Sequence, residues 1–286
     1  MMTSFPSQTN LRLRSTERSS RKVVQVVSHS SVVKLCRFQF LKQNCTSLKI
    51  WELHLQSRNS LLFRVEVLQI LWNCIFVMTA KRTPRILIIG AGGIGGMVAE
   101  LVIPALNKIE KNCSIEIMDG DIVEESNLGH QRFSHKDVGK RKTDVLSNRF
   151  SEFKFVNVKS NPVNLRVEEQ LDGYDFIIIG VDRPHPRRLV HATNVPWIDL
   201  RSTGDGHVYF TNGSDPELVA MMTPDHEPAS CQIEGAIDAG NIQFGYVNAA
   251  AAAATWLIGQ LRNQPTLRER MSSIMFGDLK FPEVKA

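Results

Sequence analysis

A glycine-rich turn at residues 90–96 constrains the fold more than any other feature of this chain. It follows an apolar, β-branched run at residues 85–89, of the kind that forms a strand buried on both faces. The turn reads Gly-Ala-Gly-Gly-Ile-Gly-Gly and contains the spacing G-x-G-x-x-G, with a helical pattern after it. In this motif the first glycine permits the tight turn, the second lets a phosphate approach the main chain, and the third allows close helix packing. The sequence therefore predicts nucleotide binding at Gly90, Gly92, Gly93 and Gly95.

Strand and helix patterns alternate through the rest of the chain. This order predicts an α/β fold, doubly wound and Rossmann-like, with a mostly parallel sheet and helices on both faces. The expected strands are 85–89, 114–118, 154–159, 174–181 and 196–200, with 206–211 pairing antiparallel. The expected helices are 97–111, 138–153, 186–194 and 247–261. Ligands of such sheets bind beyond the carboxyl ends of the strands, where the turn, Asp119, Asp121 and Asp182 are all expected.

The first 77 residues differ in composition from the rest. They contain eleven Lys and Arg against three acidic residues and no glycine, whereas residues 78–286 contain twenty-three basic and twenty-six acidic residues. We predict an atypical basic extension at 1–77 and the main domain at 78–286. Three interpretations of the extension remain open: Met78 is the true start, residues 1–37 are a transit peptide, or the segment is an accessory element with a helix through 61–77.

Composition excludes several classes of protein. The five cysteines have no framework spacing and no CxxC pair, which argues against a disulfide scaffold and against structural zinc. The pI of 9.0 is due to the first 77 residues, so it does not indicate nucleic-acid binding by the main domain. The apolar run at 67–78 is too short to cross a bilayer. We expect no membrane partner and a cytoplasmic location, with organellar targeting by residues 1–37 as the alternative.

Four ordered motifs follow the turn. Residues 119–131 read Asp-Gly-Asp-Ile-Val-Glu-Glu-Ser-Asn-Leu-Gly-His-Gln, 137–142 read Asp-Val-Gly-Lys-Arg-Lys, 182–187 read Asp-Arg-Pro-His-Pro-Arg, and 231–235 read Cys-Gln-Ile-Glu-Gly before an Ala-rich segment. Together they resemble the ThiF/MoeB/HesA family, relatives of the ubiquitin-activating enzymes, over about residues 84–262. Members of that family adenylate the C-terminal glycine of a small carrier protein. The resemblance implies ATP and Mg²⁺ as cofactors, a ubiquitin-fold or sulfur-carrier protein ending in Gly-Gly as partner, and a homodimer.

The resemblance also assigns roles to individual residues. Lys142 becomes a phosphate-binding cation, Asp182 the Mg²⁺ ligand, and Asp121 the ribose ligand with Asp119 as the alternative. Asn127 would contact phosphate, with Gln131 supporting that loop. Simpler interpretations stand beside these: Lys142 on a solvated helix face, or Asp182 as a helix cap.

Arg187 has three possible roles at this stage. The resemblance implies that it contacts phosphate or braces the loop of Asp182. The simpler interpretation is a surface partner for a nearby carboxylate.

The chain departs from the family pattern at His130, which stands where the family has an arginine that reaches the phosphates. A histidine has a pKa near 6.5 and is mostly neutral at pH 7 unless an anion raises that pKa. Arg132 and Arg183 are the nearby candidates to replace the missing charge. Two alternatives to adenylation therefore remain open: a nucleotide-binding module without turnover, and an NAD-dependent oxidoreductase.

Cys231 is the candidate nucleophile. In some family members a cysteine at this place takes the activated carrier as a thioester or acyl disulfide. A loop thiol near a cationic site is expected to have a lowered pKa and more thiolate. The alternative is a buried small residue at a turn.

Overall fold

The computed structural model describes residues 12–18, 21–27, 36–39, 49–50, 82–227 and 230–283. The chain divides into two compact units, Met1–Lys81 and Arg82–Ala286, each considered by itself. The strands described in the first unit form an antiparallel sheet in the order β1–β2–β3–β4. They are β1 (Arg12–Arg18), β2 (Arg21–Val27), β3 (Cys36–Gln39) and β4 (Lys49–Ile50). The helix expected at 61–77 lies outside the described residues.

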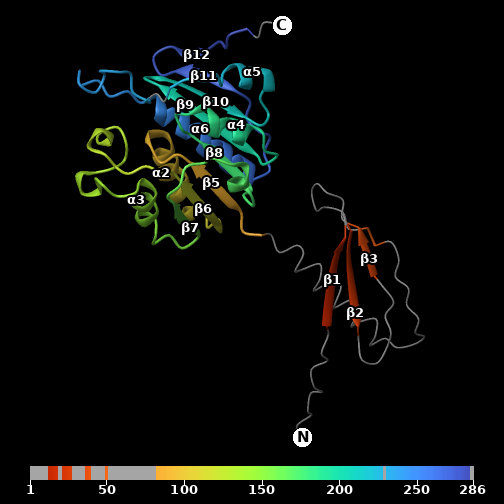
Figure 1. Cartoon of the computed structure of the whole chain (residues 1–286). Helices are drawn as coiled ribbons and strands as arrows, with labels where there is room; N and C mark the ends of the chain where they lie inside the picture. Colours follow the sequence, from red (N-terminus) through yellow and green to blue (C-terminus); the bar gives the residue numbers. More distant parts are fainter. Residues whose placement is uncertain are drawn as a thin grey trace. The chain divides into compact units, whose positions relative to one another are not determined.

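The second unit is built on an eight-stranded sheet in the order β12–β11–β10–β9–β8–β5–β6–β7 (Figure 1). The five strands from β9 to β7 run parallel, and β10, β11 and β12 are antiparallel. The strands are β5 (Arg85–Ile89), β6 (Cys113–Met118), β7 (Val156–Asn161), β8 (Phe176–Ile179), β9 (Trp197–Thr203), β10 (Gly206–Thr211), β11 (Arg270–Ser273) and β12 (Gly277–Leu279). The doubly wound, mostly parallel fold is confirmed, as is the antiparallel pairing of 206–211.

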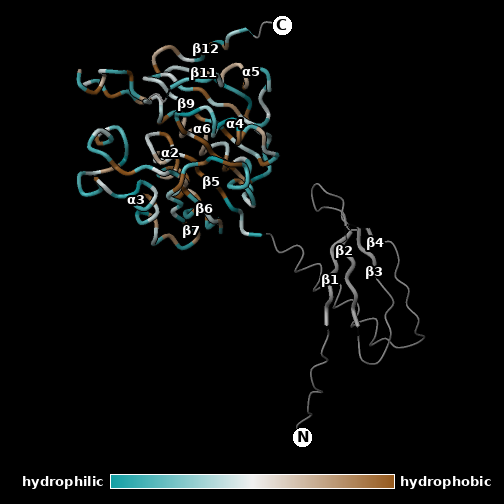
Figure 2. Tube along the Cα trace, in the orientation of Figure 1, coloured by the Kyte–Doolittle hydropathy of each residue, from teal (hydrophilic) through white to brown (hydrophobic). Residues whose placement is uncertain are grey.

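Helices cover both faces of this sheet because the central strands are apolar on both sides. Along β5, Ile86 and Ile88 face the core cluster of α2 and α6, whereas Leu87 and Ile89 face that of α4 and α5. Figure 2 shows hydrophobic residues concentrated along these central strands. The helices are α2 (Gly93–Lys108), α3 (Lys142–Arg149), α4 (Pro184–His191), α5 (Pro216–Met221) and α6 (Gly245–Leu261), with short 3₁₀ turns η1 (Glu125–Asn127), η2 (His135–Asp137) and η3 (Glu168–Leu171).

Two helices differ most from their expected bounds, and each difference has a physical reason. The first begins at Gly93 rather than at residue 97, because the glycines of the turn also form its first turn. The helix expected over 138–153 is limited to α3, since Gly139 has a φ of +83° that a right-handed helix cannot contain. As a result Lys142 is the first residue of α3 rather than an interior one, which brings its side chain close to the end of β6.

Three elements near the C-terminus were not expected: α5, β11 and β12. A signal for α5 exists, because Asp215 accepts a hydrogen bond from the N–H of Glu217 while Pro216 occupies the first helical position. Strand β11 pairs with β10 and extends the sheet to β12.

In the part of the chain that the structure describes, no helix has the length and apolar character needed to cross a membrane.

Candidate functional site

The glycine-rich turn connects β5 to α2 in a space that only glycine fits. Gly90 has a φ of +98°, and a Cβ there would lie 2.8 Å from the carbonyl oxygen of Gly180. A Cβ on Gly95 would lie 1.8 Å from the carbonyl oxygen of Gly90, well inside van der Waals contact. Gly92 is the N-cap of α2 and provides no side-chain cap. No N-cap side chain accepts from the first N–H groups of this helix, which makes its N-terminus suitable for a phosphate.

Asp119 fastens the end of β6 to this turn. Its Oδ2 accepts a hydrogen bond from the N–H of Ala91 at 2.6 Å, and its Oδ1 accepts one from the N–H of Asp121 at 2.8 Å. Burial raises the pKa of Asp119, and the two main-chain donors oppose that rise. Because both carboxylate oxygens are engaged within the chain, Asp121 is the better placed of the two to meet a ribose.

Lys142 and Asp121 lie together at the same edge of the sheet. Only 6% of Lys142 is exposed, so the solvated-face interpretation of this residue is wrong. Its Nζ lies 3.3 Å from the Oδ2 of Asp121, and its N–H donates to the carbonyl of Asp121 at 3.1 Å. The buried stem thus brings a cation to the edge where the turn presents its free N–H groups.

The loop after β6 places Gln131 next to the turn. The Oδ1 of Asn127 accepts from the N–H of Glu124, and the Asn127 carbonyl accepts from the N–H of Gln131, both at 3.0 Å. The Oε1 of Gln131 is 3.9 Å from where a Cβ on Gly92 would lie. Asn127 therefore shapes the loop, and Gln131 packs over the phosphate turn.

His130 is a neutral side chain in this loop. It is 8% exposed, and its Nδ1 has no hydrogen-bond partner among the described residues. Burial lowers the pKa of His130, and the nearby charge of Lys142 lowers it further. The free protein thus has an imidazole, not a cation, where the family pattern has an arginine.

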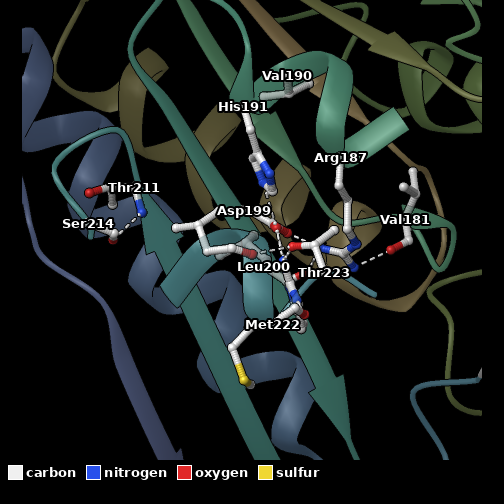
Figure 3. Close-up of polar contacts among 12 residues, drawn as sticks. Val181, Arg187, Val190, His191, Asp199, Leu200, Thr211, Ser214, Met222 and Thr223 are labelled. Atoms are coloured by element: carbon white, nitrogen blue, oxygen red, sulfur yellow. Dashed lines mark hydrogen bonds and ion pairs between the residues drawn. The ribbon is translucent and has the colours of Figure 1, made fainter. Parts of the chain in front are cut away.

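Asp182 and Arg187 follow the end of β8. Asp182 is exposed and does not cap α4, because that helix begins at Pro184 with Arg183 as its N-cap. Arg187 is buried, which excludes a surface role. Its guanidinium donates to the carbonyl of Val181 and pairs with Asp199 (Figure 3). Of the two roles that the resemblance implies for Arg187, these contacts support the bracing of the Asp182 loop.

Cys231 lies against the start of α2. Its Sγ is 3.9 Å from the position of a Cβ on Gly93, and its carbonyl accepts a hydrogen bond from the N–H of Gly204 at 2.9 Å. The expected lowering of its pKa is wrong. Burial raises the pKa of Cys231 to about 11, and this effect outweighs the opposing charge of Arg187. The thiol lies near the turn and is protonated at neutral pH.

An open cleft of about 1000 Å³ lies beside α3. It lies between the loop that follows β6, the outer side of α3 and the start of α6, and Gln131 and Tyr246 line it. The ring of Tyr246 is also 3.7 Å from where a Cβ on Gly93 would lie. Ligand pockets typically have about 300–1000 Å³, so this cleft has room for a ligand, and Gln131 and Tyr246 connect its lining to the turn. Tyr246 was missed in the sequence, where nothing in its spacing marks it.

The residues present fit a magnesium ion that arrives with a nucleotide. In the described ranges no group of three or more His, Cys, Asp or Glu side chains is placed to hold a metal. Mg²⁺ usually keeps several waters and binds one or two carboxylates together with substrate phosphates. The single exposed carboxylate of Asp182, next to the glycine-rich turn, is consistent with that mode of binding.

Comparisons with known proteins agree with this fold. The model of the ThiF family matches residues 77–286. The chain is 32% identical over 139 residues to the NEDD8-activating enzyme E1 catalytic subunit of Saccharomyces cerevisiae, covering 47% of this chain and 44% of that protein. It is 32% identical over 120 residues to the adenylyltransferase and sulfurtransferase uba4 of Aspergillus clavatus, covering 40% of this chain and 23% of that protein. The matches thus span less than half the length of these relatives.

Solved structures with the same fold include E. coli MccB. The crystal structure with AMPCPP and MccA has a TM-score of 0.52 and 21% identity, covering 68% of this chain and 62% of that chain. The structure of MccB with ATP has a TM-score of 0.50 and 20% identity, covering 77% and 70%. At these identities the likeness concerns the fold alone.

Proposed function

Because this chain belongs to the ThiF family, we propose that it catalyses the ATP-dependent adenylation of the C-terminal glycine of a ubiquitin-like or sulfur-carrier protein. The observation that carries the proposal is the meeting of three groups at one edge of the sheet. These are the free N-terminus of α2, the exposed carboxylate of Asp121 and the buried stem of Lys142. The names of the relatives, a NEDD8-activating subunit and an adenylyltransferase, support the same reaction class.

In the proposed complex the turn binds phosphate and Asp121 binds the ribose. The N–H groups at the start of α2 donate to phosphate oxygens, and the helix dipole adds a partial positive charge. Asp121 is free to accept from ribose hydroxyls because its side chain is 64% exposed. Lys142 then turns its ammonium from Asp121 toward the phosphates, a movement of a flexible side chain that needs no change in the main chain.

The reaction is an attack by a carboxylate oxygen of the carrier on the α-phosphorus of ATP. A new bond forms between that oxygen and phosphorus, the bond to the bridging oxygen breaks, and its electron pair leaves with pyrophosphate. Negative charge is redistributed onto pyrophosphate, so the protein acts mainly by positioning the reactants and placing cations. Lys142 supplies one such cation. When bound, Mg²⁺ supplies further charge neutralisation, with Asp182 as its protein ligand.

Capture of the product on Cys231 is a second, separable step of the proposal. The thiol attacks the acyl carbon of the adenylate, a thioester forms, and AMP leaves with the electron pair of the broken bond. The thiol first has to lose its proton, which its pKa of about 11 opposes in the free protein. We therefore place this step after a rearrangement of the Cys231 segment that admits water or the carrier.

The test is ATP–pyrophosphate exchange with Mg²⁺ and a panel of ubiquitin-fold proteins ending in Gly-Gly. Exchange is expected with at least one carrier, and Lys142→Ala should abolish it. Lys140→Ala is the matched control, since Lys140 is an exposed lysine two residues away. A protein that binds ATP but exchanges nothing with any carrier contradicts adenylation. Sedimentation of the active protein tests the homodimer that we propose as its working form.

A second candidate function is nucleotide-dependent binding without turnover. One observation favours it, namely the buried, neutral imidazole of His130 where an arginine stands in the family pattern. His130→Arg discriminates between the two functions. A gain of exchange from an inactive wild-type protein indicates a binding module, whereas an active wild-type protein indicates that another cation replaces the arginine.

A further inference from the structure

Asp199 is a fully buried carboxylate at the centre of a charged cluster. It lies in β9 with 0% exposure, and three side chains converge on it (Figure 3). Arg187 pairs with its Oδ1. The Nε2 of His191 lies 3.0 Å from its Oδ2, and the Nη2 of Arg201 lies 2.7 Å from the same oxygen. Arg187 is buried like Asp199, whereas His191 and Arg201 are partly buried.

The electrostatics of this cluster argue for a role other than stability. Taking charges out of water is costly, and a buried ion pair is often no more stabilising than well-packed apolar residues. Burial lowers the pKa of Arg187 to about 9 and that of Arg201 to about 10, so both remain cations at neutral pH. One buried carboxylate thus holds one buried and one partly buried cation.

That geometry links Asp199 to the turn that carries Asp182. Strand β8 ends at Ile179, so the carbonyl of Val181 lies beyond the ladder of the sheet. Arg187 donates to that carbonyl and also to the carbonyl of Leu200 on β9, at 3.2 Å. A buried carbonyl needs a donor, and Arg187 provides one that is itself fixed by Asp199.

The same turn touches the phosphate loop. A γ-carbon of Val181 lies 3.1 Å from where a Cβ on Gly90 would be, and the next residue is Asp182. The main chain that Arg187 holds therefore leads directly into the candidate metal ligand and packs on the glycine-rich turn.

Arg201 uses the same carboxylate for a different purpose. Its Nη1 donates to the carbonyl of Met222, and its Nη2 lies 2.7 Å from the Oγ1 of Thr223, both just after α5. No contact from Arg201 to residues 180–182 is found in the described part of the chain. Arg187 and Arg201 thus pair with the same aspartate, but only Arg187 holds the turn at residues 180–182. Arg201 therefore serves as an internal control for the effect of Arg187 on that turn.

We propose that Asp199 is a positioning residue of the nucleotide site, which orients Arg187 so that Arg187 fixes the main chain presenting Asp182 to metal-bound phosphates. This inference rests on the proposed function in one respect, the assignment of Asp182 to the Mg²⁺ of bound ATP. Asp199 touches no reactant and acts only through Arg187.

The test compares Arg187→Lys with Arg201→Lys in the full chain. Both changes keep a cation next to Asp199, but a lysine lacks the planar fork with which an arginine holds Asp199 and main-chain carbonyls in one fixed geometry. Binding of ATP is measured by calorimetry as a function of Mg²⁺ concentration. Arg187→Lys should raise, at least tenfold, the Mg²⁺ concentration that gives half of the maximal effect on ATP binding. It should leave the affinity for ATP without metal within twofold of the wild-type value. Arg201→Lys should lower the melting temperature comparably and shift the Mg²⁺ midpoint less than twofold.

Three outcomes overturn the proposal: equal shifts in the two variants, no shift in Arg187→Lys, or ATP binding by the wild-type protein that is insensitive to Mg²⁺. Asp199→Asn tests the aspartate directly and should reproduce the Arg187→Lys shift. If that variant does not fold, the lysine pair decides. The measurement is nucleotide binding and not exchange, so the two proposals can fail separately. A wild-type protein that binds ATP in a Mg²⁺-dependent way but shows no exchange contradicts adenylation. In that case the variants still decide the positioning role of Asp199.

Discussion

The Nζ of Lys142 lies 3.3 Å from the Oδ2 of Asp121, which joins the first residue of α3 to the segment that follows β6. The two side chains differ in exposure, at 8% for the lysine and 64% for the aspartate. The lysine side chain is therefore held by packing, whereas the exposed aspartate side chain is held mainly by the ion pair. In the proposed reaction the buried stem of Lys142 keeps its place while its ammonium turns to the phosphates, and Asp121 exchanges the ion pair for ribose hydroxyls.

Removal of the lysine charge should abolish turnover with little loss of stability. Lys142→Met keeps the apolar stem and removes the ammonium, so we expect pyrophosphate exchange to fall by about 100-fold or more, equivalent to ~2.7 kcal/mol. Lys140→Met, at an exposed site, is expected to change it less than twofold. Exchange that survives in Lys142→Met would place the phosphate-binding cation elsewhere, and the melting temperature checks that the fold is intact.

Two adjacent glycines in α2 should respond in opposite directions to the same substitution. A Cβ on Gly95 would lie 1.8 Å from the carbonyl oxygen of Gly90, whereas one on Gly96 would meet the Ala91 carbonyl at an ordinary 3.6 Å. Gly95→Ala should destabilise the protein by about 3 kcal/mol or more through overpacking. Gly96→Ala should stabilise it by about 0.5–1 kcal/mol, since alanine is the better helix former. Urea unfolding measures both, and similar values for the two variants would contradict the geometry of the turn.

The partly buried His191 of the Asp199 cluster predicts a loss of stability in acid. Burial and two neighbouring arginines lower the pKa of His191 from 6.5 to about 4. Between these values the unfolded chain binds the proton and the folded protein does not. The free energy of unfolding should therefore fall as the pH decreases from 6.5 to 4, by up to about 3 kcal/mol from this residue.

His191→Gln removes this titration and keeps a donor near Asp199. The difference in unfolding free energy between pH 7.5 and pH 5 should shrink in this variant. His185→Gln, at an exposed residue of the same helix, should leave the difference as it is in the wild-type protein. An equal effect of both substitutions would show that the acid sensitivity arises elsewhere.

The thiol of Cys231 should react slowly in the free protein. With its pKa raised from 9.0 to about 11, the thiolate fraction near neutral pH is ~100-fold below that of an ordinary cysteine. Alkylation by iodoacetamide, followed residue by residue with peptide mass mapping, should be slow in buffer and fast in urea. Alkylation in buffer at the rate seen in urea would instead indicate an exposed, reactive thiol.

The sequence predicted the fold class because its signals are local. The apolar run at 85–89 and the glycines after it identify the first strand, the turn and the parallel sheet without reference to distant residues. The ordered motifs lie at the ends of strands, and the topology brings these ends to one edge of the sheet. The motifs therefore also predicted residues that meet around the turn. The elements that were missed, α5 and the β11–β12 hairpin, have short and weakly periodic sequences, and the pairing of β11 with β10 joins residues about 60 apart.

Properties that depend on burial could not be predicted in the same way. The pKa of Cys231 was expected to be low because cations are near, but the sequence does not contain the degree of burial that reverses the shift. Asp199 was overlooked although an acidic residue inside an apolar strand pattern is a usable signal. Its partners Arg187 and His191 are 12 and 8 residues away in the chain and meet it only when α4 packs on the sheet.

The glycine-rich turn also limits how selectivity can arise. Since a Cβ is excluded at Gly90 and Gly95, the surface that this turn offers to a ligand consists largely of main-chain amides, which are chemically alike in every protein. Such a surface recognises phosphate but cannot distinguish one base, or one acyl partner, from another. Discrimination must come from the loops around the turn, where substitutions are free of this steric restriction. The anchoring of phosphate and the choice of substrate are therefore independent properties of this chain, and the second can change while the first stays constant.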